Sequence, residues 1–129
     1  MSDVDVLVKE KLVPFRQKVI EVLKEKHPYV IGIAESAMAG RKNKVGLLIT
    51  ENGKAAGEYT FLLDGINVEQ VEIGVLDAQV KHPLLGEIKP YGVLEKTDLE
   101  AMLTDDLFFT DTFAALKKAL PKMTLKFLA

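Results

Sequence analysis

Residues 45–63 read VGLLITENGKAAGEYTFLL, two strand-like runs on either side of Asn52-Gly53. Both turn residues tolerate the positive φ of a type I′ turn, and Asn-Gly between such runs is the strongest short-range signal of a β-hairpin. In the second arm, Gly57 to Leu63, large apolar residues occupy every second position from Tyr59 onward, the pattern of a sheet with one buried face. The stretch predicts an antiparallel hairpin at the centre of the fold.

Further strands are expected on the C-terminal side of this hairpin. After a turn at Asp64-Gly65, residues 68–75 alternate and extend toward Val80 with a break, and residues 91–96 read as a fourth strand. Pro83 and Pro90 bracket a loop or short crossover between them. The alternation from Met123 to Phe127 predicts a last strand, which makes about five in a mainly antiparallel sheet.

Helices are expected at both ends of the chain. Residues 11–26 carry apolar side chains at three- and four-residue intervals, and His27-Pro28 ends that helix. Residues 29–38 are apolar without a clear period. Thr97 to Glu100 has the spacing of a capping box, which starts one short C-terminal helix, and residues 108–120 form a second.

Composition is that of one globular domain, residues 1–129, with 48% hydrophobic and 28% charged residues. The chain has no cysteine, so disulfides, thiolate metal sites and a thiol nucleophile are excluded. The N-terminus is acidic where a secretion signal is positive, and no apolar run approaches the ~20 residues that span a bilayer. We therefore expect a cytoplasmic protein.

Charge is uneven along the chain. Residues 64–106 carry ten acids and three lysines, whereas residues 107–129 carry four lysines and Asp111 alone. Nucleic-acid binding requires a broad basic face, and a net charge of −2 argues against that class.

Residues suited to catalysis are few: two histidines, two serines and no cysteine. Ser36 lacks the surroundings of a nucleophile elbow. An enzyme would need Asp98, Glu100, Asp105 or His82 to converge in one cleft. We expect no catalytic residues and no cofactor.

A metal site is also not expected. Asp105, Asp106, Asp111 and His82 could bind a divalent ion, but they lack calcium-loop spacing and fit better as helix caps and a turn residue.

Arg41, Lys42 and Lys44 follow Gly40 and form a candidate site for an anion or headgroup, although a solvated loop explains them equally well.

The C-terminal third is rich in flexible apolar side chains, which line adaptable cavities as readily as they fill cores. Phe108 and Phe109 point about 100° apart on a helix, so one of them is expected to face a cavity, a partner or a membrane surface. The candidate ligand-binding residues are Tyr59, Phe61, Met102, Phe108, Phe109, Phe113, Leu116 and Met123.

The order of elements resembles that of the sterol carrier protein domain, an α+β fold whose helices and sheet enclose a tunnel for lipids. The resemblance rests on the amphipathic first helix, on residues 57–65 and 71–74 as meander strands, and on residues 91–103 as a strand leading into a helix. It differs at Thr104 to Leu107, where the family has a Gly-Lys-Leu type turn, and no further apolar helix follows Phe127. The resemblance implies a tunnel wall that includes Tyr59, Phe61, Met102, Phe109, Phe113 and Met123.

Two hypotheses of different class follow. The first is non-catalytic binding of a lipid, fatty acid or other long apolar ligand in an internal hydrophobic cavity. The second is an assembly protein that forms a homodimer through its apolar C-terminal face and the edge strand Met123 to Phe127.

Overall fold

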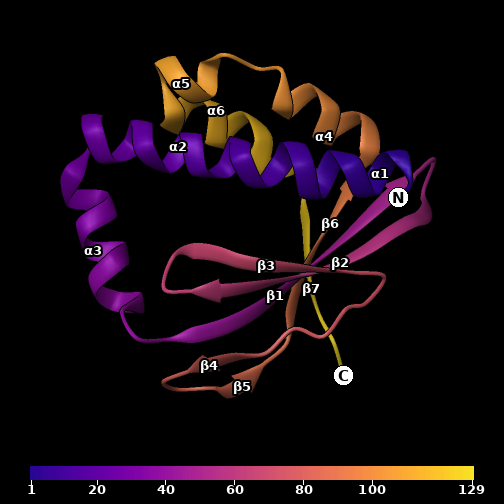
Figure 1. The fold of residues 1–129 in the computed structure, drawn as a ribbon, viewed down its shortest axis with the longest axis horizontal. Helices are drawn as coiled ribbons and strands as arrows, with labels where there is room; N and C mark the ends of the chain where they lie inside the picture. The colour runs from indigo at the N-terminus through magenta and orange to yellow at the C-terminus, as the bar shows by residue number, and fades with distance from the viewer.

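The computed structural model describes all residues 1–129 and is α+β, with helices along one face of a five-stranded mixed sheet (Figure 1). The strands are β1 (Lys42–Glu51), β2 (Lys54–Asp64), β3 (Asn67–Ile73), β6 (Pro90–Glu95) and β7 (Thr124–Phe127). Their order is β3-β2-β1-β6-β7. Every neighbouring pair is antiparallel except β1 and β6, so the prediction of a mainly antiparallel sheet is confirmed.

The central hairpin forms where it was predicted. Asn52 and Gly53 join β1 to β2 with φ values of 54° and 80°, both positive as a type I′ turn requires. Leu47 lies opposite Tyr59 in the register, so both side chains point to the same face of the sheet.

The N-terminal helix is longer than the predicted 11–26. Ser2 and Asp5 form a capping box, and one continuous helix runs through α1 (Asp3–Val6), the π-helical segment η1 (Leu7–Leu12) and α2 (Val13–Lys26). Pro14 lacks an N–H and its ring crowds the carbonyl of Glu10. The wider π-helical turns lie immediately before this proline, and the Val13 amide bonds to the Val8 carbonyl, five residues back.

The apolar run after His27 is helix α3 (Pro28–Met38), which leaves the end of α2 at a steep angle (Figure 1) and makes most of its contacts with that helix. Tyr29 and Ile33 are exposed on it. Its outward face is therefore apolar, which explains why no periodicity identified it.

Three α-helices follow β6, not the predicted two. They are α4 (Lys96–Leu103), α5 (Leu107–Thr110) and α6 (Thr112–Ala119), and the 3₁₀ turn η2 (Leu120–Lys122) leads into β7. The prediction of a capping box at Thr97 was wrong. Helix α4 begins at Lys96, its N-cap is Glu95, and the Glu95 side chain makes no capping hydrogen bond to the helix.

The connection from β3 to β6 crosses the sheet face opposite the helices. The Thr60 hydroxyl, fully buried, donates to the Val75 carbonyl (2.7 Å) and accepts from the Asp77 amide (2.9 Å). This crossing segment allows β6 to lie parallel to β1. The region from Pro83 to Pro90, predicted as a loop or short crossover, belongs to this connection and contains part of a small hairpin of β4 (Val80–His82) and β5 (Gly86–Ile88).

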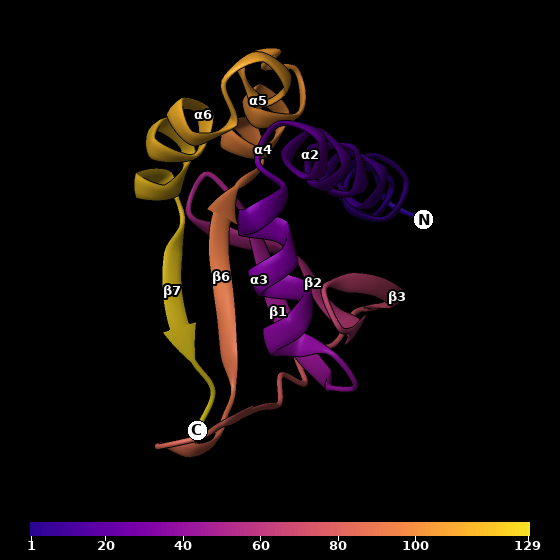
Figure 2. The same ribbon diagram turned by 90° about the vertical axis from the view of Figure 1, so that its left-hand side faces the viewer.

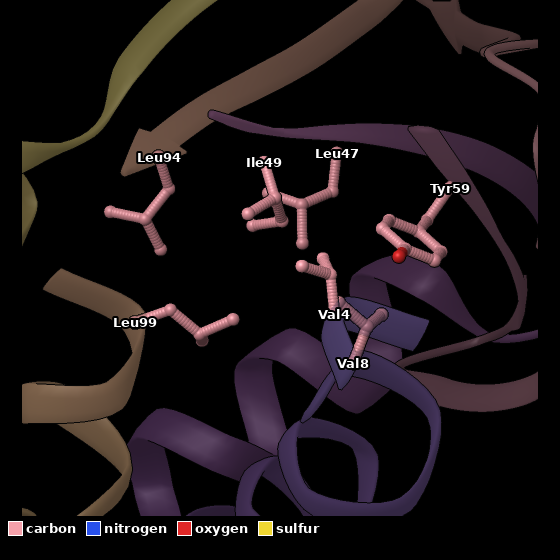
Figure 3. Close-up of a cluster of buried hydrophobic side chains, with 7 residues drawn as sticks. All are labelled: Val4, Val8, Leu47, Ile49, Tyr59, Leu94 and Leu99. Atoms are coloured by element: carbon pink, nitrogen blue, oxygen red, sulfur yellow. The ribbon is translucent and has the colours of Figure 1, made fainter. Parts of the chain in front are cut away.

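The core lies between the N-terminal helix, the sheet and α4 (Figure 3). Seven buried residues form it: Val4, Val8, Leu47, Ile49, Tyr59, Leu94 and Leu99. None of the helices combines the length and the apolar composition needed to cross a bilayer.

Candidate functional site

A pocket of about 520 Å³ lies among the end of β6, α4, α5, α6 and η2, and nine of its fourteen lining residues are hydrophobic. Leu94 comes from β6, Met102 from α4, Phe108 from α5 and Leu116 from α6, and Met123 precedes β7. All fourteen lining residues fall between Leu94 and Met123, so the pocket is formed by the C-terminal third of the chain.

A break between α5 and α6 places Phe108 in this pocket. Asp111 is the N-cap of α6, and its carboxylate accepts from the Ala114 amide at 3.2 Å. The Thr112 hydroxyl donates to the Phe108 carbonyl at 2.7 Å. Because α6 starts afresh at this cap, residues 108–120 do not form the single helix that was predicted.

The N-terminal helix holds α5 in position. The Lys26 ammonium donates to the carbonyls of Phe109 and Thr110 at 3.1 and 3.2 Å, where α5 ends. The Phe15 ring meets Phe108 edge-on, with 5.1 Å between ring centroids. One side of Phe108 is thus packed on α2 while the residue also lines the pocket.

Charged side chains form part of the pocket rim. Lys118 Nζ lies 3.0 Å from Asp105 Oδ2, and Lys122 Nζ lies 3.9 Å from Asp98 Oδ1. The hydrogen bond from Lys118, followed by that from the Leu107 amide, lowers the pKa of the Asp105 carboxyl below its usual value. A carboxyl that acts as a general acid at neutral pH needs a raised pKa, whereas the pKa of Asp105 is lowered. Asp105 is therefore not suited to that role.

The predicted ligand-binding residues separate into two groups. Met102, Phe108, Leu116 and Met123 line the pocket. Tyr59 is 0% exposed within the core. The other three predicted residues also lie outside the pocket: Phe61, Phe109 and Phe113.

These three side chains have separate surroundings. Phe61 packs against the core cluster beneath the N-terminal helix. Phe109 contacts Phe15, with the Lys18 ammonium 4.7 Å from its ring centroid. Phe113 is 45% exposed and lies against the His27 ring. A single tunnel wall containing all the predicted residues is therefore not formed.

Sequence reasoning missed the small residues of the pocket. Ala115 and Ala119 lie one helical turn apart on α6, and both line it. Alanines four apart on the apolar face of a helix were the available signal, since small side chains leave space beside a neighbouring element.

The predicted anion-binding residues are elsewhere. Lys42 and Lys44 line a separate hollow of about 280 Å³, and Arg41 is exposed just before β1. Lys42 pairs with Glu69 at 3.5 Å and Lys44 with Asp77 at 3.4 Å. None of the three lines the apolar pocket.

The acidic residues and His82 have local roles. Asp105 accepts from the Leu107 amide at 3.0 Å, and His82 Nδ1 accepts from the amides of Leu84 and Leu85 within the β4–β5 turn. No group of three or more histidine, cysteine, aspartate or glutamate side chains is placed to hold a metal ion.

Comparison with protein-family models and with curated proteins found no match to this chain.

Proposed function

We propose that this chain is a non-catalytic cytoplasmic carrier that binds a lipid, fatty acid or other long apolar molecule in the pocket among α4, α5, α6 and η2. The observation that carries the proposal is the pocket itself, because about 520 Å³ with a mainly hydrophobic lining is typical of small-molecule sites. The resemblance of the sequence to sterol carrier protein domains supports it.

Binding would rest on burial of apolar surface. Removing an acyl chain from water contributes about 0.8 kcal/mol for each buried methylene and needs no directed polar contact. Met102 and Met123 supply unbranched, adaptable walls, which suit ligands of varying shape. Leu120 and Met123 line the pocket and are partly exposed, so the pocket opens to solvent at these residues and the ligand would enter there.

A substitution that fills the pocket tests this proposal. Ala119→Phe adds an aromatic ring from α6 into the pocket, and we expect it to weaken binding of a fluorescent fatty acid at least about tenfold, the equivalent of 1.4 kcal/mol. The same change at Ala37, exposed on α3 and outside the pocket, is the matched control.

Fluorescence titration of the wild type and both variants gives the comparison. A wild type that takes up no fatty acid contradicts the proposal. If Ala119→Phe and the wild type bind the fatty acid with equal affinity, the ligand binds at another part of the molecule.

A further inference from the structure

The sheet has two open edges, β3 and β7. They are the outermost strands in the order β3-β2-β1-β6-β7 and lie on opposite sides of the molecule (Figure 2). An edge strand presents unpaired backbone N–H and C=O groups, which is a template for pairing with another strand.

The backbone groups that point outward can be assigned from the ladder. The Leu128 amide donates to the Lys89 carbonyl at 2.9 Å. Hydrogen-bonded pairs alternate along antiparallel strands, so Leu125 and Phe127 direct their backbone groups away from β6. On the other edge the Gly74 amide donates to the Glu58 carbonyl at 2.7 Å, so Val71 and Ile73 direct theirs away from β2.

One pairing register between β7 and β3 would match their outward backbone hydrogen-bonding groups and also bring apolar side chains together. If Leu125 of one copy lies opposite Ile73 of another, Phe127 lies opposite Val71, and both pairs have outward backbone groups. All four side chains lie on the helix-covered side of their sheets, by the registers with Gly92, Pro90, Tyr59 and Phe61. Leu125, Phe127 and Ile73 are 64%, 57% and 40% exposed, so apolar surface would be removed from water.

The same register pairs opposite charges. In it Lys126 of one copy would lie opposite Glu72 of the other, on the other side of the sheet from the apolar pairs, as the registers with Tyr91 and Thr60 indicate. Neither residue has an ion-pair partner within the chain. Opposite charges directly across an antiparallel pair are favourable.

We propose that β7 pairs in an antiparallel manner with β3 of a second copy of this chain. The two strands run in opposite directions within one molecule, because β3, β1 and β6 share a direction and β7 reverses it. The joined sheet therefore continues from copy to copy with its helices on the same side. Such a contact is head-to-tail, and it produces a ring or an open filament.

Charge distinguishes this contact from a two-fold dimer in which β7 pairs with β7. Residues 112–129 contain no acid, so a symmetric dimer places no carboxylate opposite Lys126. The β3 edge belongs to the acidic part of the chain and the β7 edge to the basic part. Opposite charge therefore favours the head-to-tail pairing.

Sedimentation velocity over a range of protein concentrations tests the proposal. We expect wild-type mass to rise with concentration beyond a dimer, and Lys126→Glu and Glu72→Lys each to weaken association about fivefold, the equivalent of 1 kcal/mol for a charge pair. An equimolar mixture of the two variants should regain association, since every contact between unlike molecules pairs a lysine with a glutamate.

Charge reversals elsewhere provide the controls. Lys117→Glu on α6 and Glu25→Lys on α2 are exposed positions away from both edges and should leave association unchanged. A wild type that stays monomeric or stops at a dimer overturns the proposal, as does a mixture that does not regain association. An effect of Lys126→Glu without one of Glu72→Lys also overturns it.

Discussion

Tyr59 carries the buried polar contact of the core. Its hydroxyl donates to Asp5 Oδ1 at 2.6 Å, and the Ser2 amide donates to Oδ2 of the same carboxylate at 3.0 Å. Burial, and then the hydrogen bond to Asp5, raises the pKa of Tyr59 well above its ordinary value. The bond thus ties the first helical turn to β2.

Gly57 leaves the space that this contact requires. A Cβ at position 57 would lie 2.7 Å from Cε2 of the Tyr59 ring. The ring can therefore extend over residue 57 to reach Asp5 only because position 57 has no side chain.

We expect Tyr59→Phe to lower the free energy of unfolding by about 1–2 kcal/mol at pH 7, the lower part of the range for a hydrogen bond to a charged group, because Asp5 is only half-buried and solvent screens its charge. Hydrogen bonds from Tyr59 and Ser2 lower the pKa of the Asp5 carboxyl from 3.8. A carboxyl with a lowered folded pKa stabilises the protein above its unfolded pKa, and this contribution is lost as pH falls through the folded value.

The difference between Tyr59→Phe and the wild type should therefore shrink as pH falls through about 3.8, where half of the Asp5 carboxyls are protonated in the unfolded chain, and on toward the lower folded pKa. Urea denaturation at a series of pH values measures it. Tyr29→Phe, at an 86% exposed position, is the control and should cost nothing. A difference that persists unchanged in acid would show that Asp5 is not the partner that matters.

At the scale of elements, α6 depends on its cap. It has eight residues, and the Asp111 carboxylate satisfies one of the amides left unpaired at its N-terminus. Ala115, Leu116 and Ala119 project from this short helix into the pocket. Its stability and the shape of the pocket are therefore linked.

We expect Asp111→Ala to lower the free energy of unfolding by about 1 kcal/mol, because the cap bond is lost. The same variant should bind the fluorescent fatty acid more weakly, since one wall of the pocket becomes less ordered. Asp106→Ala is the matched control, because Asp106 at the N-cap of α5 makes no side-chain cap bond. Equal losses in the two variants would exclude capping as the cause.

Elements were predictable where local chemistry decides conformation. Asn52-Gly53 specifies its turn through two residues that accept positive φ. α3 was not predictable, because its exposed face, with Tyr29 and Ile33, is as apolar as its packed face. The division between α5 and α6 was also missed, because the cap residue Asp111 interrupts an apolar stripe that otherwise continues.

For the molecule as a whole, binding of the proposed ligand in the pocket should increase the free energy of unfolding. A ligand that binds only the folded state adds about 2.7 kcal/mol to the free energy of unfolding at a free concentration of 100 Kd. We expect fatty acid at this concentration to raise the melting temperature of the wild type more than that of Ala119→Phe, because tenfold weaker binding leaves the variant only about 1.4 kcal/mol of this stabilisation. Differential scanning fluorimetry measures both, and equal shifts in the two proteins would contradict binding in this pocket.

The amino-acid order alone was enough for the α+β class, the central hairpin and the approximate positions of the five strands of the main sheet, because period-two alternation and turn residues act over a few neighbours. It also predicted eight ligand-binding residues, of which Met102, Phe108, Leu116 and Met123 line the pocket and the other four do not. Contacts distant in the chain determined the rest. Periodicity shows which residues share a face of one element, but not which other element that face meets. Tyr59 therefore entered the core beneath the N-terminal helix, while Leu125 and Phe127, equally apolar, lay at an open edge of the sheet.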